Sequence, residues 1–365
     1  MLKAPFDEQK LPLSYLKPLG SLLDTSLIQL DNEKNWIKCH RLVALAVTES
    51  MEPRELSLVF HKLLFFLNAT FPRQDHGEPL LNHWRKCEEL ASQIQALLET
   101  FSLYRDHVAG DHIGEPVLLC ELICRCSWYF YEKGHFETAL EMVGKGFSIC
   151  AGALKTGFHP GYTHVFVQDM VSHLVNVQAA VAREKPDLAN VLGLAQQVCE
   201  IREKNKLSKP GLDPGGDGWI LMARGNLAVS LMTLDRMEEA LKILLEILPL
   251  LETDDVKHTQ DIHLSNAALC FSRLGQLDKA TDYINRAIKC VNQRDGADET
   301  EALAICYFYL SGIREAKNDI PGAHQHLQRC LRIRTTLKPH HYYTGFTHHK
   351  MGVLEQLSGR HERAV

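Results

Sequence analysis

A short phrase recurs along the chain: a turn residue, an apolar residue two positions later, and an alanine three positions after that. The alanines of these copies are Ala139, Ala240, Ala280, Ala323 and Ala364, and a weaker copy in REKPDLANVL supplies Ala189. The gaps between successive alanines are 50, 51, 40, 43 and 41 residues. Self-similarity at a period of roughly 20–50 residues is typical of stacked repeats, in which each unit contacts its neighbours. The spacing therefore predicts a helical solenoid.

The residues around each alanine predict a helical hairpin. Most residues five positions before the alanines can take the left-handed conformation that ends a helix: Gly134, Glu184, Asp235, Gly275, Asn318 and Gly359. Three positions before the alanines stand the apolar residues Phe136, Met237, Leu277 and Ile320, with Pro186 and His361 as exceptions. Twelve positions before them stand mainly small residues, which let two helices cross closely: Ser127, Val177, Ala228, Ala268, Ser311 and Gly352. Each unit is predicted to be a helix, a tight turn and an antiparallel helix.

This combination resembles the tetratricopeptide repeat (TPR), and the lengthened period resembles its kinesin-light-chain type. The units at 225–248 and 265–288 match best, the unit at 172–203 is degenerate, and the chain reaches Val365 inside a sixth unit. The resemblance implies an all-α fold, a helical-hairpin solenoid or TPR-like superhelix, over residues 113–365. The incomplete last repeat lacks a polar cap, so self-association through it is expected.

Residues 49–112 are expected to form further helical hairpins leading into the array. MEPRELSLVFHKLLFFLNATF and PLLNHWRKCEELASQIQALLETFSLY carry apolar residues at helical spacing, and RQDHGEP (73–79) separates them. Pro53 suits the first turn of a helix. KLSKPGLDPGGDG (206–218) is predicted to be a loop because it is rich in glycine and proline.

Residues 1–48 are interpreted as a small winged-helix remnant. SLIQLD (26–31) and WIKCHRLV (36–43), joined by NEKN, predict a β-hairpin followed by a helix, and a further helix is expected ahead over LPLSYLKPLGSLLDTSLI. This arrangement resembles the end of the winged-helix domain in NLR-type (NB-ARC) signalling ATPases, also seen in multidomain fungal proteins, where TPRs often follow.

In the NLR-type family a Met-His-Asp-Leu motif follows the wing, and its histidine contacts a bound nucleotide. The matching residues here are Cys39, His40, Arg41 and Leu42, so the histidine matches and the arginine departs from the pattern. No GxxxxGK[ST] phosphate loop occurs in the sequence, so no nucleotide or other cofactor is expected. Whether the chain is the sensor half of a longer ATPase-containing protein stays open.

Composition and the absence of targeting patterns argue against several classes of binding partner and several cellular locations. The formal net charge of −5, with no basic surplus, argues against nucleic acid. No apolar run approaches the ~18 residues of a membrane span, and the N-terminus lacks the apolar core of a signal peptide. Eleven scattered cysteines without a secretion signal predict reduced thiols. The expected location is the cytoplasm, with the nucleus as the alternative.

The sequence predicts no catalytic or metal site. The CxxxCxC motif at 120–126 lacks the paired spacing of a zinc site and is interpreted as buried packing. The histidine pairs at 340–341 and 348–349 lie in KPHHYYTGFTHHKMG, which has no HExxH motif and is interpreted as an inter-repeat linker. No GxSxG, strand-associated GxGxxG or kinase signature is present.

Candidate binding residues stand fourteen positions before the alanines, on the helices that would line the concave groove. In related TPR domains an asparagine at this place grips the backbone of an extended peptide, because an amide both donates and accepts. The predicted peptide-binding residues are Arg125, Asn226, Asn266, Tyr309 and Lys350, while the degenerate unit at 172–203 has Val175 there. The alternative is that they are solvated or capping side chains. The lack of lysine eleven positions before the alanines argues against a chaperone-tail carboxylate clamp.

The leading hypothesis is a non-enzymatic protein–protein interaction scaffold that binds a peptide or protein in the concave groove. One form of this hypothesis is that the chain is the sensor half of an NLR-like signalling protein. The alternative is an accessory or regulatory factor for gene expression or for a secondary metabolic pathway. A third hypothesis is an enzyme with an unrecognised site between repeats.

Overall fold

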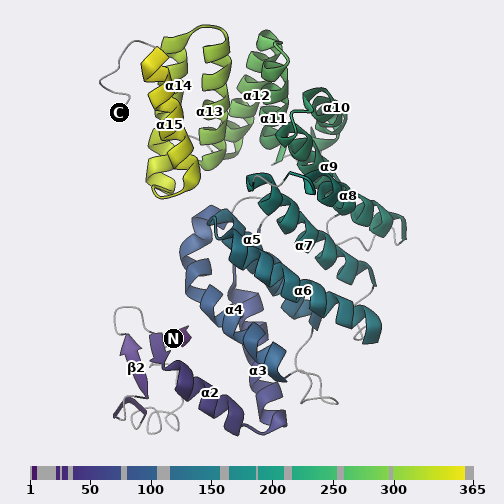
Figure 1. Cartoon of the computed structure of the whole chain (residues 1–365), viewed down its shortest axis with the longest axis vertical. Coiled ribbons are helices and arrows are strands. Elements are labelled where there is room, and N and C mark those ends of the chain that lie inside the picture. Colours follow the sequence, from purple (N-terminus) through teal and green to yellow (C-terminus); the bar gives the residue numbers. More distant parts are fainter. Residues whose placement is uncertain are drawn as a thin grey trace.

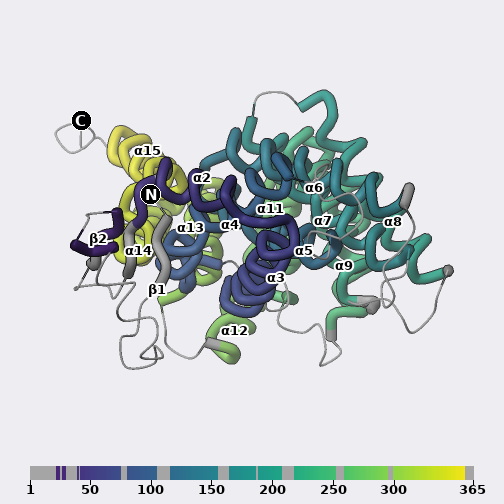
Figure 2. Tube along the Cα trace, turned by 90° about the horizontal axis from the view of Figure 1, so that it is seen from below, coloured from purple at the N-terminus to yellow at the C-terminus, as the bar shows by residue number. Residues whose placement is uncertain are grey.

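The computed structural model describes residues 2–5, 22–24, 27–31, 36–74, 80–104, 116–156, 164–185, 188–208, 216–252, 259–295 and 299–357, and the structural statements below concern these residues. Helices follow one curved path from α3 (Pro53–Thr70) to α15 (Tyr342–Leu357) (Figure 1). A small N-terminal sheet lies at one side of the molecule and α8 (Val191–Ser208) at the other, as both views show (Figure 1, Figure 2).

Antiparallel helix pairs form the array in the described part of the chain. They are α5 (Pro116–Glu132) with α6 (Phe136–Thr156), α7 (His164–Glu184) with α8, α9 (Gly216–Thr233) with α10 (Met237–Ile247), α11 (Gln260–Arg273) with α12 (Leu277–Asp295), and α13 (Glu301–Ala316) with α14 (Ile320–Leu337). Helix α15 packs on α14 as the first helix of a sixth unit. The expected helical-hairpin solenoid is confirmed.

The tight turns contain the predicted left-handed residues. Their φ angles are 78° at Gly134, 59° at Asp235, 74° at Gly275 and 62° at Asn318. In each turn the next N–H donates to a carbonyl five residues back: His135 to Phe130, Arg236 to Leu231, Gln276 to Phe271 and Asp319 to Arg314. This bond is part of the Schellman arrangement, which satisfies carbonyls that the helix end leaves free. The four apolar anchors then begin α6, α10, α12 and α14, and the following alanines are fully buried.

The hairpin of α7 and α8 departs from the predicted register. Ala189 is exposed and lies in the turn, so it is not the buried alanine of the second helix. That alanine is Ala195, which is 2% exposed. Six residues (185–190) separate α7 from α8, whereas three separate the helices of the other pairs. The three extra residues shift the α7 positions relative to those counted from Ala189.

Two predicted loops are shorter than expected. The neighbouring helices extend into the segment 206–218 at both ends: α8 continues to Ser208, and α9 begins at Gly216. The interpretation of KPHHYYTGFTHHKMG as a linker is wrong from Tyr342 onward, where α15 begins. The helix tolerates these residues because Thr344 and Thr347 are buried and bond to carbonyls.

The N-terminal part combines a sheet with three helices. Strands β2 (Ile28–Asp31) and β3 (Trp36–Cys39) form the predicted antiparallel hairpin, and β1 (Leu2–Pro5) adds a third strand beside β3, in the order β1-β3-β2. Helix α2 (Arg41–Ser50), α3 and α4 (Trp84–Tyr104) follow, the last preceded by a 3₁₀ turn, η2 (Leu80–His83). Pro53 opens α3 as expected. Most of the helix expected over LPLSYLKPLGSLLDTSLI lies outside the described residues.

The array curves until its last helix reaches its beginning. The His341 Nε2–H donates to the carbonyl of Glu132, 2.9 Å away and 209 residues earlier in the chain. The Tyr343 hydroxyl donates to Glu184 Oε1 at 3.1 Å, and the ring of Tyr342 lies 6.2 Å from that of Phe136. The beginning of α15 therefore closes the path against α5, α6 and α7, and we call this contact the seam (Figure 1).

Candidate binding surfaces

The first helices of the pairs line the inner side of the curve. Helix α5 packs on α7, and α11 packs on α13. In the described part of the chain, the second helices of successive pairs do not pack on each other to a similar extent. A curved stack brings its inner helices together and spreads its outer ones. The predicted binding residues do lie on five different inner helices, α5, α9, α11, α13 and α15.

Three carboxamides lie on successive inner helices, α7, α9 and α11. Asn226 Nδ2–H on α9 donates to Asn176 Oδ1 on α7 at 3.0 Å, and Asn226 Oδ1 has no partner among the described residues. Asn266 on α11 stands at the same place as Asn226, seven residues before the helix end, and is 8% exposed. Its carboxamide makes no hydrogen bond within the described chain. We call Asn176, Asn226 and Asn266 the amide row.

Apolar side chains accompany the amide row on the same helices. Ile262 on α11 is 38% exposed, and Met222, Val229 and Leu269 are partly exposed. Asn176 was missed by counting: fourteen positions before Ala189 stands Val175, and seven positions before the end of α7 stands Val177, so neither count reaches it.

Arg125 is engaged within the protein. Its guanidinium donates to the carbonyls of Asn68 at 3.1 Å and Phe71 at 2.8 Å, and its side chain is 11% exposed. Burial lowers the pKa of Arg125 from its usual value. These bonds satisfy carbonyls at the end of α3, so the side chain ties α3 to the first repeat.

Tyr309 and Lys350 are also engaged within the protein, the first by packing and the second by an ion pair. Tyr309 packs against the apolar core of the second half of the array, and burial raises the pKa of its phenol. Lys350 Nζ lies 3.3 Å from Glu315 Oε2 and 5.2 Å from the centre of the Phe308 ring. The five predicted residues therefore differ: the two asparagines keep hydrogen-bonding groups available, Arg125 and Lys350 use theirs internally, and Tyr309 packs against the core.

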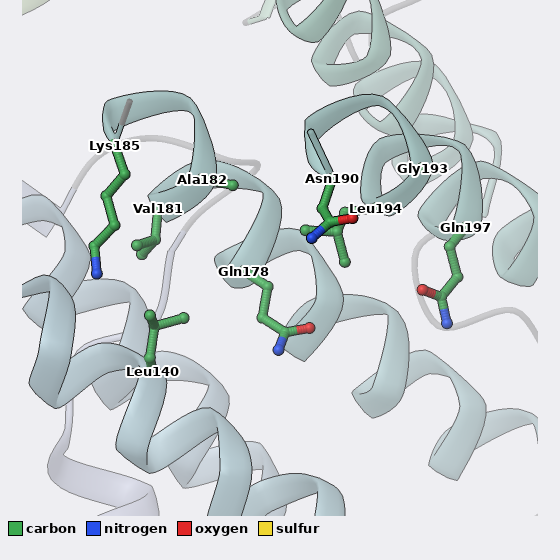
Figure 3. A pocket seen from close by; sticks show the side chains of 9 residues that line it. All are labelled: Leu140, Gln178, Val181, Ala182, Lys185, Asn190, Gly193, Leu194 and Gln197. Atoms are coloured by element: carbon green, nitrogen blue, oxygen red, sulfur yellow. The ribbon is translucent and has the colours of Figure 1, made fainter. Parts of the chain in front are cut away.

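A pocket of about 480 Å³ lies between the outer helices α6 and α8, over the second half of α7 (Figure 3). Its apolar lining comes from Leu140 on α6, Val181 and Ala182 on α7, and Gly193 and Leu194 on α8. The side chains of Gln178, Asn190, Gln197 and Lys185 supply its polar groups. The sequence analysis did not find this pocket.

The seam contains a carboxylate with an unusual set of donors. Leu80 N–H donates to both oxygens of Glu132, Trp84 Nε1–H to Oε2 at 3.1 Å, and Trp128 Nε1–H to Oε1 at 2.7 Å. Burial raises the pKa of Glu132 to about 7 although these donors act to lower it. The residue thus joins η2, α4 and α5, while its carbonyl receives His341.

Thiols and histidines are used in packing. Cys120 and Cys124 are buried on α5. The hydrogen bond between the two thiols and burial raise the pKa of Cys120, which makes it a poor nucleophile. No group of three or more potential metal ligands occurs in the described residues. His40 Nδ1 accepts from Leu42 N–H at 3.2 Å and caps α2.

None of the described helices is long and apolar enough to cross a membrane.

Comparison with known proteins bears on the fold. No family model matches the sequence, and no curated protein matches it. Among solved structures, aspartyl phosphate phosphatase F from Bacillus subtilis is similar over 96% of this chain and 76% of its own, with 11% identity and a TM-score of 0.53. The chain has a tetratricopeptide-like repeat fold. That likeness concerns architecture alone at this level of identity.

Other structures similar to this TPR-like chain have lower scores. BtubC from P. vanneervenii covers 63% of this chain and 86% of its own, with 15% identity and a TM-score of 0.47. A signal transduction ATPase with numerous domains (STAND) and a tetratricopeptide repeat sensor, from Pyrococcus horikoshii, covers 99% of this chain and 53% of its own, with 15% identity and a TM-score of 0.45.

Proposed function

We propose that this TPR-like chain is a non-catalytic interaction scaffold that binds an extended peptide segment of a partner protein along its inner helices. The observation that carries the proposal is the amide row. Asn226 has a free carboxamide oxygen, and Asn266 is nearly buried without any hydrogen bond to the described protein. An extended peptide offers alternating N–H and C=O groups, which carboxamides match from one side.

The surroundings of the row fit the side chains of such a peptide. Partly exposed Met222, Val229, Ile262 and Leu269 flank the asparagines. Apolar surface beside fixed polar groups is the usual composition of a peptide-binding groove. Arg125, Tyr309 and Lys350 contribute by holding the inner helices in place, since Arg125 and Lys350 bond within the protein and Tyr309 packs against its core.

Peptides selected on the purified protein from a random phage-displayed library test this function. The double variant Asn226→Ala/Asn266→Ala should weaken a selected peptide at least about tenfold, because two hydrogen-bonding amides are lost. Asn285→Ala, on an exposed position of outer helix α12, is the matched control. Unchanged affinity in the double variant, or no selectable peptide, would overturn the proposal.

Nothing in the amide row distinguishes a sensor from another scaffold. The hairpin of β2 and β3 followed by α2 supports the comparison with the wing of NLR-type ATPases. His40 caps α2, so its side chain already has a structural role. We therefore keep the sensor role as a form of the scaffold proposal.

A further inference from the structure

Two buried thiols from the two helices of the first repeat lie in contact. Cys120 on α5 and Cys150 on α6 have their sulfur atoms 3.1 Å apart, and the two residues are 1% and 3% exposed. Both are free thiols in the structure. A disulfide bond is about 2.05 Å long, so the sulfur atoms lie about 1 Å beyond bonding distance. A movement of that size would join the two helices covalently.

The close approach of the two sulfur atoms depends on a glycine in α6. Gly146 lies one turn before Cys150, and its carbonyl accepts from the Cys120 thiol at 3.8 Å. A Cβ at Gly146 would lie 2.9 Å from the Leu174 side chain of α7 and 3.2 Å from that of Ile123 on α5. Helix axes are usually ~8–10 Å apart, and the missing side chain lets α5 and α7 pack closely on α6 at this turn. The thiol contact is therefore fixed by the packing of three helices.

Cys124 is a second thiol neighbour of Cys120, but its position does not suit a disulfide. It lies one turn further along α5, and the two thiols are hydrogen-bonded. Cβ atoms four residues apart on a helix are separated by ~5–6 Å, whereas a disulfide needs ~3.5–4.5 Å. A bond within α5 would distort the helix, while a bond from Cys120 to Cys150 joins two helices that are already in contact.

The space beside the pair excludes a bulky adduct. Cys120 and Cys150 line a gap that has no room for a water-sized molecule. The other side chains around it are apolar, among them Ile149, Val167 and Met170. A glutathione attached to either sulfur atom would not fit while the three helices are packed. The oxidised product that this packing accepts is the disulfide between the two cysteines.

We propose that Cys120 and Cys150 are a modification site, which a disulfide oxidant such as glutathione disulfide converts to an intramolecular disulfide that locks the first repeat. One thiolate of the pair attacks the oxidant, forms a mixed disulfide and releases one glutathione thiolate. The second thiolate attacks the protein sulfur of the mixed disulfide and releases the other glutathione. The two thiols lose two protons and two electrons in total, and glutathione disulfide gains them as two molecules of glutathione.

The position of the pair determines what the bond does to the hairpin. Helix α5 ends at Glu132 and α6 begins at Phe136, so the helical rise places the pair roughly 20 Å from the turn that joins them. The turn holds one end of the hairpin, and the disulfide holds it far from the turn. The bond spans a sequence separation of 30 residues, which lowers the entropy of the unfolded chain. The first repeat should therefore open less often when the pair is oxidised.

Burial makes the oxidation depend on opening of the hairpin. The hydrogen bond with Cys124 and burial raise the pKa of Cys120, and the hydrogen bond with Cys120 and burial raise the pKa of Cys150. Because the thiolate is the attacking species, exchange requires transient separation of the helices. A low, non-denaturing concentration of urea should speed the oxidation, whereas it would not change the oxidation rate of a pair at the surface.

Peptide mapping of the full chain tests the site. The reduced protein is equilibrated with glutathione buffers of increasing disulfide content in low urea, and the remaining thiols are blocked with N-ethylmaleimide. Digestion without reductant should yield linked peptides that contain Cys120 and Cys150. Glutathione adducts at the partly exposed Cys39 and Cys290 are recognised by their added mass. If Cys120 and Cys150 are both still blocked by N-ethylmaleimide in the most oxidising buffer, or if Cys120 is linked to another cysteine, the proposal is overturned.

Single substitutions separate this pair from the other thiols of α5. Cys150→Ala should leave Cys120 as a free thiol. Cys126→Ala, which removes an equally buried thiol of α5, is the matched control and should form the same linked peptides as the unmodified chain. Cys124→Ala should form them as well. Loss of the linked peptides in Cys124→Ala would contradict the assignment of Cys150 as the direct partner.

Hydrogen exchange measures whether the bond locks the repeat. In the oxidised protein, exchange in α5 and α6 should slow at least about tenfold, and by more than in α13 and α14, because the constraint acts on the first repeat. Cys150→Ala exposed to the same buffers should show no such slowing. Unchanged or faster exchange in α5 and α6 of the oxidised protein would show that the disulfide does not act as a lock.

Discussion

At the scale of single residues, α9 and α11 approach each other closely at Gly225. A Cβ there would lie 2.1 Å from Cε1 of His263, whose side chain is buried at 2% exposure. Gly225→Ala should therefore lower the free energy of unfolding by ~1–2 kcal/mol, the cost of overpacking less the helix preference for alanine. Urea unfolding followed by circular dichroism measures the change.

A helical glycine with open surroundings provides the control for Gly225. A Cβ at Gly144 meets nothing within 4 Å, so Gly144→Ala should be neutral or stabilising by up to ~1 kcal/mol. The clash with His263 should also be relieved in Gly225→Ala/His263→Ala, whose loss should be less than the sum of the two single losses. Equal stability of Gly225→Ala and Gly144→Ala would show that the helices adjust freely.

His263 also gives the stability of the array a dependence on pH. Neither ring nitrogen has a partner in the described chain, and burial lowers the pKa from 6.5 to about 4. As the pH falls from 6.5 to 4, the unfolded chain binds a proton that the folded protein does not, so the free energy of unfolding decreases. The contribution of this residue is ~3 kcal/mol over that window.

Replacement of His263 isolates this contribution. As the pH falls from 6.5 to 4, the free energy of unfolding of His263→Leu should increase by that amount relative to the unmodified chain. Any difference between the two proteins at neutral pH is a constant that does not affect this comparison. His348→Gln, at an exposed position of α15, controls for the loss of one histidine. Urea unfolding curves at three pH values suffice, and a pH-independent difference between the two proteins would contradict the assignment.

At the scale of elements, the left-handed turns hold each helix pair together. Gly275 has φ of 74°, and a Cβ there would meet no atom, so Gly275→Ala introduces backbone strain without a side-chain clash. The strain should destabilise the α11–α12 pair by ~1–2 kcal/mol. Hydrogen exchange should then speed up in both helices, more than in α5 and α6, because repeats are stabilised mainly by their neighbours.

The matched control is Gly345→Ala in α15, where the glycine is helical and also has open surroundings. That change should slow exchange slightly or leave it unchanged. If Gly275→Ala leaves exchange in α11 and α12 unaltered, the turn does not limit the stability of the pair.

The elements were predictable where the determinants are local. Asp235 and Asn318 stand at turn positions, and both adopt positive φ as their repeat phrase predicted. The α7–α8 pair was misread because no signal near Ala189 marks the three additional turn residues.

At the scale of the whole molecule, the seam could not be inferred from the sequence. His341 contacts Glu132 across 209 positions, and no repeat rule specifies how far a solenoid curves. The curvature accumulates from small rotations between units, which depend on packing throughout the array. The binding residues were only half predictable for a related reason: counting located the inner helices, while the partners of Arg125 on α3 lie outside the repeat pattern.

The seam predicts that the array opens when its contacts are removed. His341 and Tyr342 contribute a hydrogen bond to Glu132 O and ring contacts with Trp84 and Phe136, worth together ~2–4 kcal/mol. His341→Ala/Tyr342→Ala should increase the radius of gyration in small-angle X-ray scattering and leave the helical circular dichroism signal nearly unchanged. Phe346→Ala, which is 57% exposed on α15, should leave both unaltered. An unchanged radius in the double variant would mean that packing between neighbouring pairs alone sets the curvature, and that the seam is a consequence of it.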